Sequence, residues 1–184
     1  MSCFSSCVAE WNSGNRGQFI QWSTTSNDDV IYHNVKLQTP APFNEVSGQA
    51  EWGNLYYAMK AVSNSSLSPF RYSRSMIQGD NITYNIHTGD TSRSAFVHSG
   101  VLDNTTDTGP HNINNPFPVF AISRDLGTIQ STQAPLVWAV GYTIDPAISY
   151  TDLFGAPATQ RYSYYRSKYD DDGALVSGAF SWGD

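Results

Sequence analysis

The chain has 184 residues and a formal net charge of −6, and charged residues make up only 14% of it. Aromatic residues are equally frequent, a balance that favours an all-β protein over a helical bundle, which needs many Glu, Lys, Ala and Leu residues. The ten lysines and arginines are scattered, which excludes a basic patch for a nucleic-acid backbone. The length predicts a single domain over residues 1–184, and the strand pattern described below predicts that it is a β-sandwich.

The first part of the chain predicts three strands joined by short turns. Polarity alternates over residues 3–11, and residues 19–25 and 30–37 follow turns rich in Asn, Gly and Asp. Turn signals at intervals of roughly 8–12 residues are typical of a sandwich or a barrel. One face of the third strand carries four side chains, Ile31, His33, Val35 and Leu37.

The middle of the chain predicts one central strand and three further strands. Two prolines exclude residues 38–49 from the centre of a sheet. Residues 55–62 are apolar on both faces and therefore predict a central strand. The next three predicted strands, separated by loops that carry Gly-Asp turns, are residues 70–76, 82–88 and 94–100.

The last part of the chain predicts the strongest core strands and one helix. Residues 118–127 and 135–143 are the most apolar segments, and residues 161–169 could form one more strand. Residues 170–179 are expected to be the one helix, because acidic residues at its start complement the helix dipole. The expected fold is an all-β antiparallel sandwich with at most one short helix near the C-terminus.

Four motifs occur in a distinctive order between residues 8 and 150. The first is Val8–Trp11 followed by Ser13–Gly14, and the second runs from His33 through Pro42–Phe43 to Glu51–Ala58. The third is Asp107 followed by Phe117–Ala121 and Asp125–Gly127, and the fourth is Ala139–Tyr142 followed by Asp145–Ala147. As a set they resemble the β-sandwich domain that precedes the catalytic domain in the fungal extracellular glutaminase family. The resemblance implies a β-sandwich and a glutaminase lineage. The family's catalytic part is a separate helical domain that nothing in this chain resembles, so no catalytic residue is assigned.

A carboxylate stands beside a tryptophan twice, at Glu10–Trp11 and at Glu51–Trp52. Two carboxyl groups about 5 to 9.5 Å apart can hydrolyse a glycosidic bond, and tryptophan rings can stack on sugars. The alternative is that the glutamates bond backbone or arginine groups and that the tryptophans pack in the core. Because both tryptophans adjoin turns, Trp11, Glu51 and Trp52 are candidate ligand-binding residues.

The long polar loop over residues 102–118 is the second candidate site. A loop of this length inside a compact domain is usually either functional or disordered. Its Asn, Asp and Thr side chains offer mixed hydrogen-bond donors and acceptors. The candidate ligand-binding residues in this loop are Asp103, Asn104, Asp107, His111 and Asn112.

Metal and cofactor sites are not expected. The four histidines lie far apart in the sequence, there is no CxxC motif, and the acidic run 170–172 lacks the spacing of a calcium loop. On one extended strand, Cys3 and Cys7 would lie about 13 Å apart, too far for a disulfide bond.

Three glycosylation sequons and the absence of long apolar runs bear on localisation. No apolar run reaches the length of a membrane span, and no secretory leader precedes Cys3. The sequons at Asn64, Asn81 and Asn104 each adjoin loop-like sequence, so these asparagines are candidate glycosylation sites. We therefore expect a secreted protein whose signal peptide is not part of this chain.

Three functional hypotheses follow from the sequence. The first is a non-catalytic recognition module that binds a glycan or a cell-surface protein. The second is a residual amidohydrolase of the glutaminase type, and its only motivation is the resemblance. The third is a structural domain that forms a homo-oligomer by pairing an exposed edge strand. No hypothesis involves a nucleic-acid partner or a membrane span.

Overall fold

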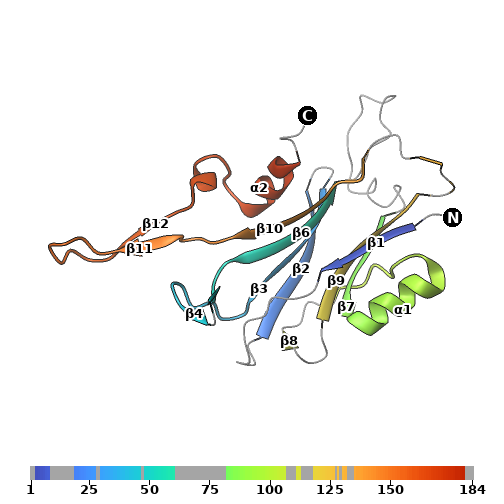
Figure 1. Cartoon of the computed structure of the whole chain (residues 1–184), viewed down its shortest axis with the longest axis horizontal. Helices are drawn as coiled ribbons and strands as arrows, with labels where there is room; N and C mark the ends of the chain where they lie inside the picture. Colours follow the sequence, from blue (N-terminus) through green and yellow to red (C-terminus); the bar gives the residue numbers. More distant parts are fainter. Residues whose placement is uncertain are drawn as a thin grey trace.

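The computed structural model describes residues 3–8, 19–27, 30–46, 48–60, 82–106, 111–112, 118–126, 128, 130–131 and 135–180. Over these residues, two antiparallel sheets face each other and short helices lie outside them (Figure 1). The expected all-β antiparallel sandwich is confirmed. Within the described part of the chain, no helix has the length and apolarity needed to cross a membrane.

The strands divide into two large sheets and two small ribbons. The five-stranded sheet runs in the order β10 (Trp138–Thr143), β6 (Asn54–Lys60), β3 (Val30–Leu37), β2 (Phe19–Asn27) and β8 (His111–Asn112). The three-stranded sheet runs in the order β1 (Cys3–Val8), β9 (Pro118–Asp125) and β7 (Ile82–Thr88). The ribbons are β4 (Glu45–Val46) with β5 (Gln49–Ala50), and β11 (Ile148–Tyr150) with β12 (Thr159–Arg161).

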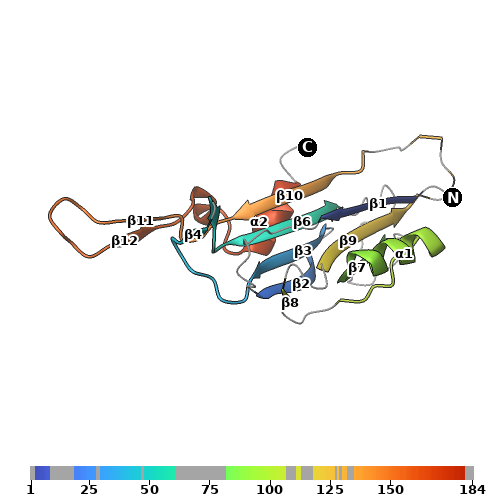
Figure 2. The same ribbon diagram turned by 60° about the horizontal axis from the view of Figure 1, so that its bottom comes forward.

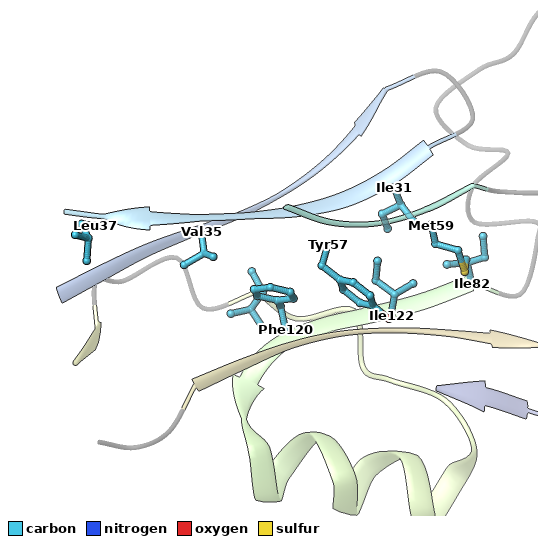
Figure 3. Packing of buried hydrophobic residues seen from close by; sticks show 9 residues of the cluster. Ile31, Val35, Leu37, Tyr57, Met59, Ile82, Phe120 and Ile122 are labelled. Atoms are coloured by element: carbon cyan, nitrogen blue, oxygen red, sulfur yellow. The ribbon is translucent and has the colours of Figure 1, made fainter. Parts of the chain in front are cut away.

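The main core lies between the two sheets (Figure 3). Tyr57 of β6 packs its ring against Phe120 of β9, with 5.6 Å between the ring centroids. The predicted shared face of β3 is confirmed, because Ile31, Val35 and Leu37 enter this core and His33 is fully buried. The buried residues of the core cluster are Ile31, Val35, Leu37, Tyr57, Met59, Ile82, Ile86, Phe120 and Ile122.

A second apolar layer covers the other face of β3 and β6. Val176 and Phe180, from the end of the chain, pack there on side chains of both strands, Val30, Tyr32, Tyr56 and Ala58. Two-sided burial explains why the sequence of β6 is apolar on both faces, and its predicted central position between β10 and β3 is confirmed. The covering helix is α2 (Asp172–Ala179), and it confirms the helix predicted near the C-terminus.

Helix α1 (Gly89–Ser99) corrects the strand predicted over residues 94–100. The Thr88 side chain accepts a hydrogen bond from the Thr91 backbone amide at 3.3 Å, which caps the first turn. Asp90 lies in that turn, and Gly100 ends the helix with a φ of 73°. The Gly-Asp pair that suggested a hairpin is therefore a helix start, and the described residues contain one α-helix more than expected.

Two further predictions near the C-terminus need correction. Residues 135–143 were expected to be a core strand, but β10 is an edge strand with Val140 and Tyr142 exposed. Only the first residue of the strand predicted over 161–169 is in β12, and the 3-10 helix η2 (Tyr164–Ser167) follows. The strand predicted over residues 70–76 lies outside the described residues.

Candidate functional site

Glu51 and Trp52, directly before β6, are both buried, with 3% and 7% of their surface exposed. The Glu51 carboxylate accepts a hydrogen bond from the side-chain amide of Asn44. The Glu51 backbone amide donates to the Asn44 carbonyl at 2.9 Å, and the Glu51 carbonyl accepts from the Ala41 amide at 2.8 Å. Glu51 therefore fixes the proline-rich segment before it onto the start of β6.

Trp52 is a packing residue rather than the surface residue that its position beside a turn suggested. Its indole Nε1 donates to the Pro146 carbonyl at 2.9 Å, and its ring packs against Phe43 with 5.4 Å between centroids. The Tyr142 hydroxyl donates to the Trp52 carbonyl. These contacts join the start of β6 to the end of β10 and to the Pro146 corner. Ligand binding by Trp52 stays a prediction, without support from this placement.

The first carboxylate–tryptophan pair, Glu10 with Trp11, lies outside the described residues. The predicted ligand-binding role of Trp11 is therefore untested, as is any convergence of the two glutamates. Asp107 lies outside the described residues as well.

The first described part of the polar loop, residues 102–106, is ordered largely by its own side chains. Asp103 Oδ1 accepts three hydrogen bonds: from Asn85 Nδ2 at 3.2 Å, from the Thr105 amide at 3.3 Å and from the Thr105 hydroxyl at 2.8 Å. Burial alone would raise the pKa of Asp103, but these donors outweigh it and hold the pKa below its ordinary value. Asp103 is therefore an anion at neutral pH.

Asn104 and Thr105 attach this loop to β7. Asn104 has a φ of 57°, and its side-chain oxygen accepts from the Tyr84 amide at 3.0 Å. The Ile86 amide donates to the Thr105 carbonyl at 3.0 Å, and Thr106 forms a parallel bridge with Ile86. Asn104 is exposed at this edge. These contacts fix the backbone of the loop, which is polar and carries the negative charge of Asp103.

The predicted residues of the long loop lie on two different sheets. Asp103 and Asn104 border β7 of the three-stranded sheet. His111 and Asn112 form β8, which pairs with Ile20 and Phe19 of β2 in the five-stranded sheet. The predicted site is therefore not one strip of chain but two separately anchored segments.

Sequence reasoning missed a partly buried polar cluster under α2. Arg166 of η2 donates through Nε to Asp145, and its Nη2 lies 2.7 Å from Asp172 Oδ1. Asp172 Oδ2 accepts from the Tyr56 hydroxyl and, at 3.0 Å, from Asn54 Nδ2. These five side chains join β6, the corner after β10, η2 and the start of α2.

The protonation states in this cluster suit a structural role. Burial, together with the hydrogen bond to Asp172, raises the pKa of the Tyr56 hydroxyl above its ordinary value, so Tyr56 stays a neutral donor. Burial alone would lower the pKa of Arg166, but its bond to Asp145 and the charge of Asp172 raise it. Arg166 offsets one of the two negative charges of Asp145 and Asp172, and its contacts with both carboxylates give the cluster a structural role.

The described residues contain no group of three or more His, Cys, Asp or Glu side chains placed to hold a metal ion.

Comparison with known proteins places the chain in a family. Residues 1–181 match the family described as "Domain of unknown function (DUF5127)". The chain is 35% identical over 144 residues to Glutaminase A of Aspergillus oryzae, an alignment that covers 78% of this chain and 18% of that protein. It is 25% identical over 160 residues to a probable glutaminase of Arthroderma benhamiae, covering 79% of this chain and 16% of that protein.

The chain therefore spans less than a fifth of the length of the curated relatives that it matches. No solved structure matches it significantly. The resemblance to fungal glutaminases that the four ordered motifs indicated is confirmed, and the chain belongs to the DUF5127 family as a partial domain of the fungal glutaminase type.

Proposed function

We propose that this chain is a non-catalytic recognition module of a glutaminase-like fungal protein. The observation that carries the proposal is that three carboxylates, the buried Glu51 and the half-buried Asp145 and Asp172, are bonded to side chains of the fold. Glu51 holds the segment before β6, and Asp145 and Asp172 share Arg166 beneath α2. A general acid or base must reach a substrate within hydrogen-bonding distance, whereas these carboxylates already bond to side chains of the fold.

The coverage of the relatives is compatible with catalysis by another part of those longer proteins. The word glutaminase in their names describes proteins of which this chain covers 18% and 16%. Residual amidohydrolase activity in this segment is the second candidate, and only those names favour it.

The loop over residues 103–106 is the recognition surface of this proposal. It presents Asp103, Asn104, Thr105 and Thr106 at an exposed edge, and internal hydrogen bonds fix its backbone. A preformed loop lowers the entropic cost of binding. Its mixed donors and acceptors suit a polyhydroxylated ligand, so we propose a glycan or a cell-surface glycoprotein as the ligand class.

Binding to a glycan array and to fungal cell surfaces tests this proposal. We expect the wild-type chain to bind at least one glycan class, and Asp103→Ala to weaken that binding at least about tenfold, equivalent to about 1.4 kcal/mol. Asp90→Ala is the matched control, because Asp90 is also an exposed aspartate but lies on α1. The absence of any signal at high micromolar concentration of folded protein would remove the recognition hypothesis.

We also propose that the protein is secreted and that Asn104 is glycosylated, and because that glycan would cover part of the recognition loop, the binding tests use protein made without glycosylation. The Asn104 side chain is exposed, and Thr106 completes its sequon. Expression with a secretion signal in a fungal host should give a mass step that an endoglycosidase removes. Both Asn104→Gln and Thr106→Ala should reduce the mass that the endoglycosidase removes by one glycan, whereas an unchanged mass loss in both variants would contradict the assignment. Asn64 and Asn81, outside the described residues, stay candidate sites.

A further inference from the structure

The ribbon of β11 and β12 with its connecting turn, residues 148–161, forms an arm that projects away from the two sheets (Figure 1, Figure 2). Its tip carries Leu153 and Phe154, which are 100% and 96% exposed. Ile148 and Tyr150 are also exposed along its length. Large apolar side chains gathered on one projecting element mark a surface that binds a partner.

The tip of the arm has a defined conformation. Asp152 Oδ1 accepts hydrogen bonds from the Phe154 amide at 2.9 Å and from the Ala156 amide at 3.1 Å. At the base, the Ala147 amide donates to the Arg161 carbonyl at 2.8 Å. A two-stranded ribbon alone is only marginally stable in water. An ordered turn that presents Leu153 and Phe154 is therefore best explained by a surface on which they pack.

The same chain carries an uncovered apolar strand face next to this arm. Trp138, Val140 and Tyr142 of β10 stand opposite Met59, Tyr57 and Leu55 of β6 and point to the core side of the sheet. Trp138 reaches the core and stacks on Tyr57, with 5.7 Å between centroids. Val140 and Tyr142 are 61% and 44% exposed, because the three-stranded sheet is narrower than the five-stranded sheet.

We propose that two copies of this chain clasp each other, with the arm of each copy packed on the exposed inner face of β10 in its partner. The arm continues onward from the end of β10 in both views (Figure 1, Figure 2). β10 and the outgoing leg of the arm, residues 148–153, each contain six residues, and the first three residues of the leg form β11. A twofold axis near their junction would lay each arm alongside β10 of the partner.

Charge and symmetry favour a second copy of the chain as the partner of the arm and of the exposed face of β10. The arm contains one acidic and one basic residue, Asp152 and Arg161, and β10 contains neither kind. Two copies of a chain of net charge −6 can therefore meet at these surfaces without opposing like charges. Because each copy gives an arm and receives one, the contact is isologous and closes as a dimer. The clasp is independent of the recognition loop at residues 103–106.

Sedimentation velocity over a range of concentrations tests the clasp with three variants. We expect a wild-type monomer–dimer equilibrium, and both the arm variant Leu153→Ser/Phe154→Ser and the strand variant Val140→Ser should raise the dimer dissociation constant at least about tenfold. Val97→Ser is the matched control, because Val97 is 84% exposed on α1, outside both surfaces. The control should leave the dissociation constant unchanged.

Mixing the arm variant with the strand variant gives the sharper result. A mixed pair retains one intact arm on one intact strand, so we expect a heterodimer tighter than the homodimer of either variant. At concentrations where the wild type is monomeric, thermal unfolding of each variant should match the wild type, because the replaced side chains are exposed. A wild-type chain that stays monomeric at high micromolar concentration would overturn the proposal and assign the arm to a different partner. Equal weakening by Val97→Ser would also overturn it.

Discussion

Replacing Asp172 by asparagine is expected to lower the free energy of unfolding by about 2 to 3 kcal/mol, because hydrogen bonds to a charged group contribute roughly 1.5 to 3 kcal/mol. Asp172 accepts from Tyr56 and Asn54 and lies 2.7 Å from the guanidinium of Arg166. The asparagine NH2 group is itself a donor, and it would face the donor groups of these three side chains. Urea unfolding followed by tryptophan fluorescence at pH 7 measures the change.

Asp90→Asn is the matched control for this prediction. Asp90 also lies in the first turn of a helix, but its pair with Arg93, at 3.6 Å, is exposed. Its replacement should change the free energy of unfolding by less than about 0.5 kcal/mol. A double-mutant cycle of Asp172→Asn with Tyr56→Phe should give a coupling above about 0.5 kcal/mol. Equal effects of Asp172→Asn and Asp90→Asn would show that the cluster does not hold α2 on the sheet.

Acidification from pH 7 to pH 4 is expected to remove about 3 kcal/mol of stability through His33 alone. The imidazole Nε2 donates to the Ala121 carbonyl at 2.9 Å and so links the two sheets. The ring lies among Tyr57, Tyr84 and Phe120. Burial lowers the pKa of His33 from 6.5 to about 4, and the hydrogen bond to Ala121 opposes this shift only in part.

The direction of the effect follows from which state binds the proton. Between pH 6.5 and pH 4 the unfolded chain protonates His33 while the folded chain keeps it neutral. The stability contribution is therefore complete above pH 6.5, falls as the pH drops, and reaches its lowest level below pH 4. Urea unfolding at several pH values measures it.

His33→Gln separates this histidine from the acidic groups of the chain. The glutamine amide can donate to the Ala121 carbonyl but does not titrate. Between pH 7 and pH 4 the free energy of unfolding of this variant should therefore fall by about 3 kcal/mol less than that of the wild type. His98→Gln, at an exposed position on α1, should keep the wild-type dependence. If the free energy of unfolding depended on pH in the same way in the wild type and in His33→Gln, a buried neutral histidine would be contradicted.

The sheets were largely predictable because periodicity reports burial directly. Residues 30–37 alternate on the core side, and residues 54–60 are apolar on both faces because a sheet covers one face and α2 the other. Helix α1 was missed because residues 94–100 alternate weakly. Its caps at Thr88 and Gly100 were visible in the sequence and could have identified it.

The sites were less predictable, because they depend on contacts between distant segments. Tyr56 and Asp172 are 116 positions apart, and nothing local to either predicts the bond between them. Trp52 adjoins a turn, yet its indole is held by Pro146, 94 positions away. The arm does have a local signal, the turn from Asp152 to Gly155, which follows the alternating residues 148–151.

Ammonia release from glutamine by the purified chain tests most directly whether this module is non-catalytic. Glutaminase A of Aspergillus oryzae, of which the chain matches 18%, serves as the positive control. The sample must first show cooperative unfolding, so that a negative result describes the folded protein. We predict no ammonia above the buffer level. Release in proportion to the concentration of the chain would contradict the proposal and restore the amidohydrolase hypothesis.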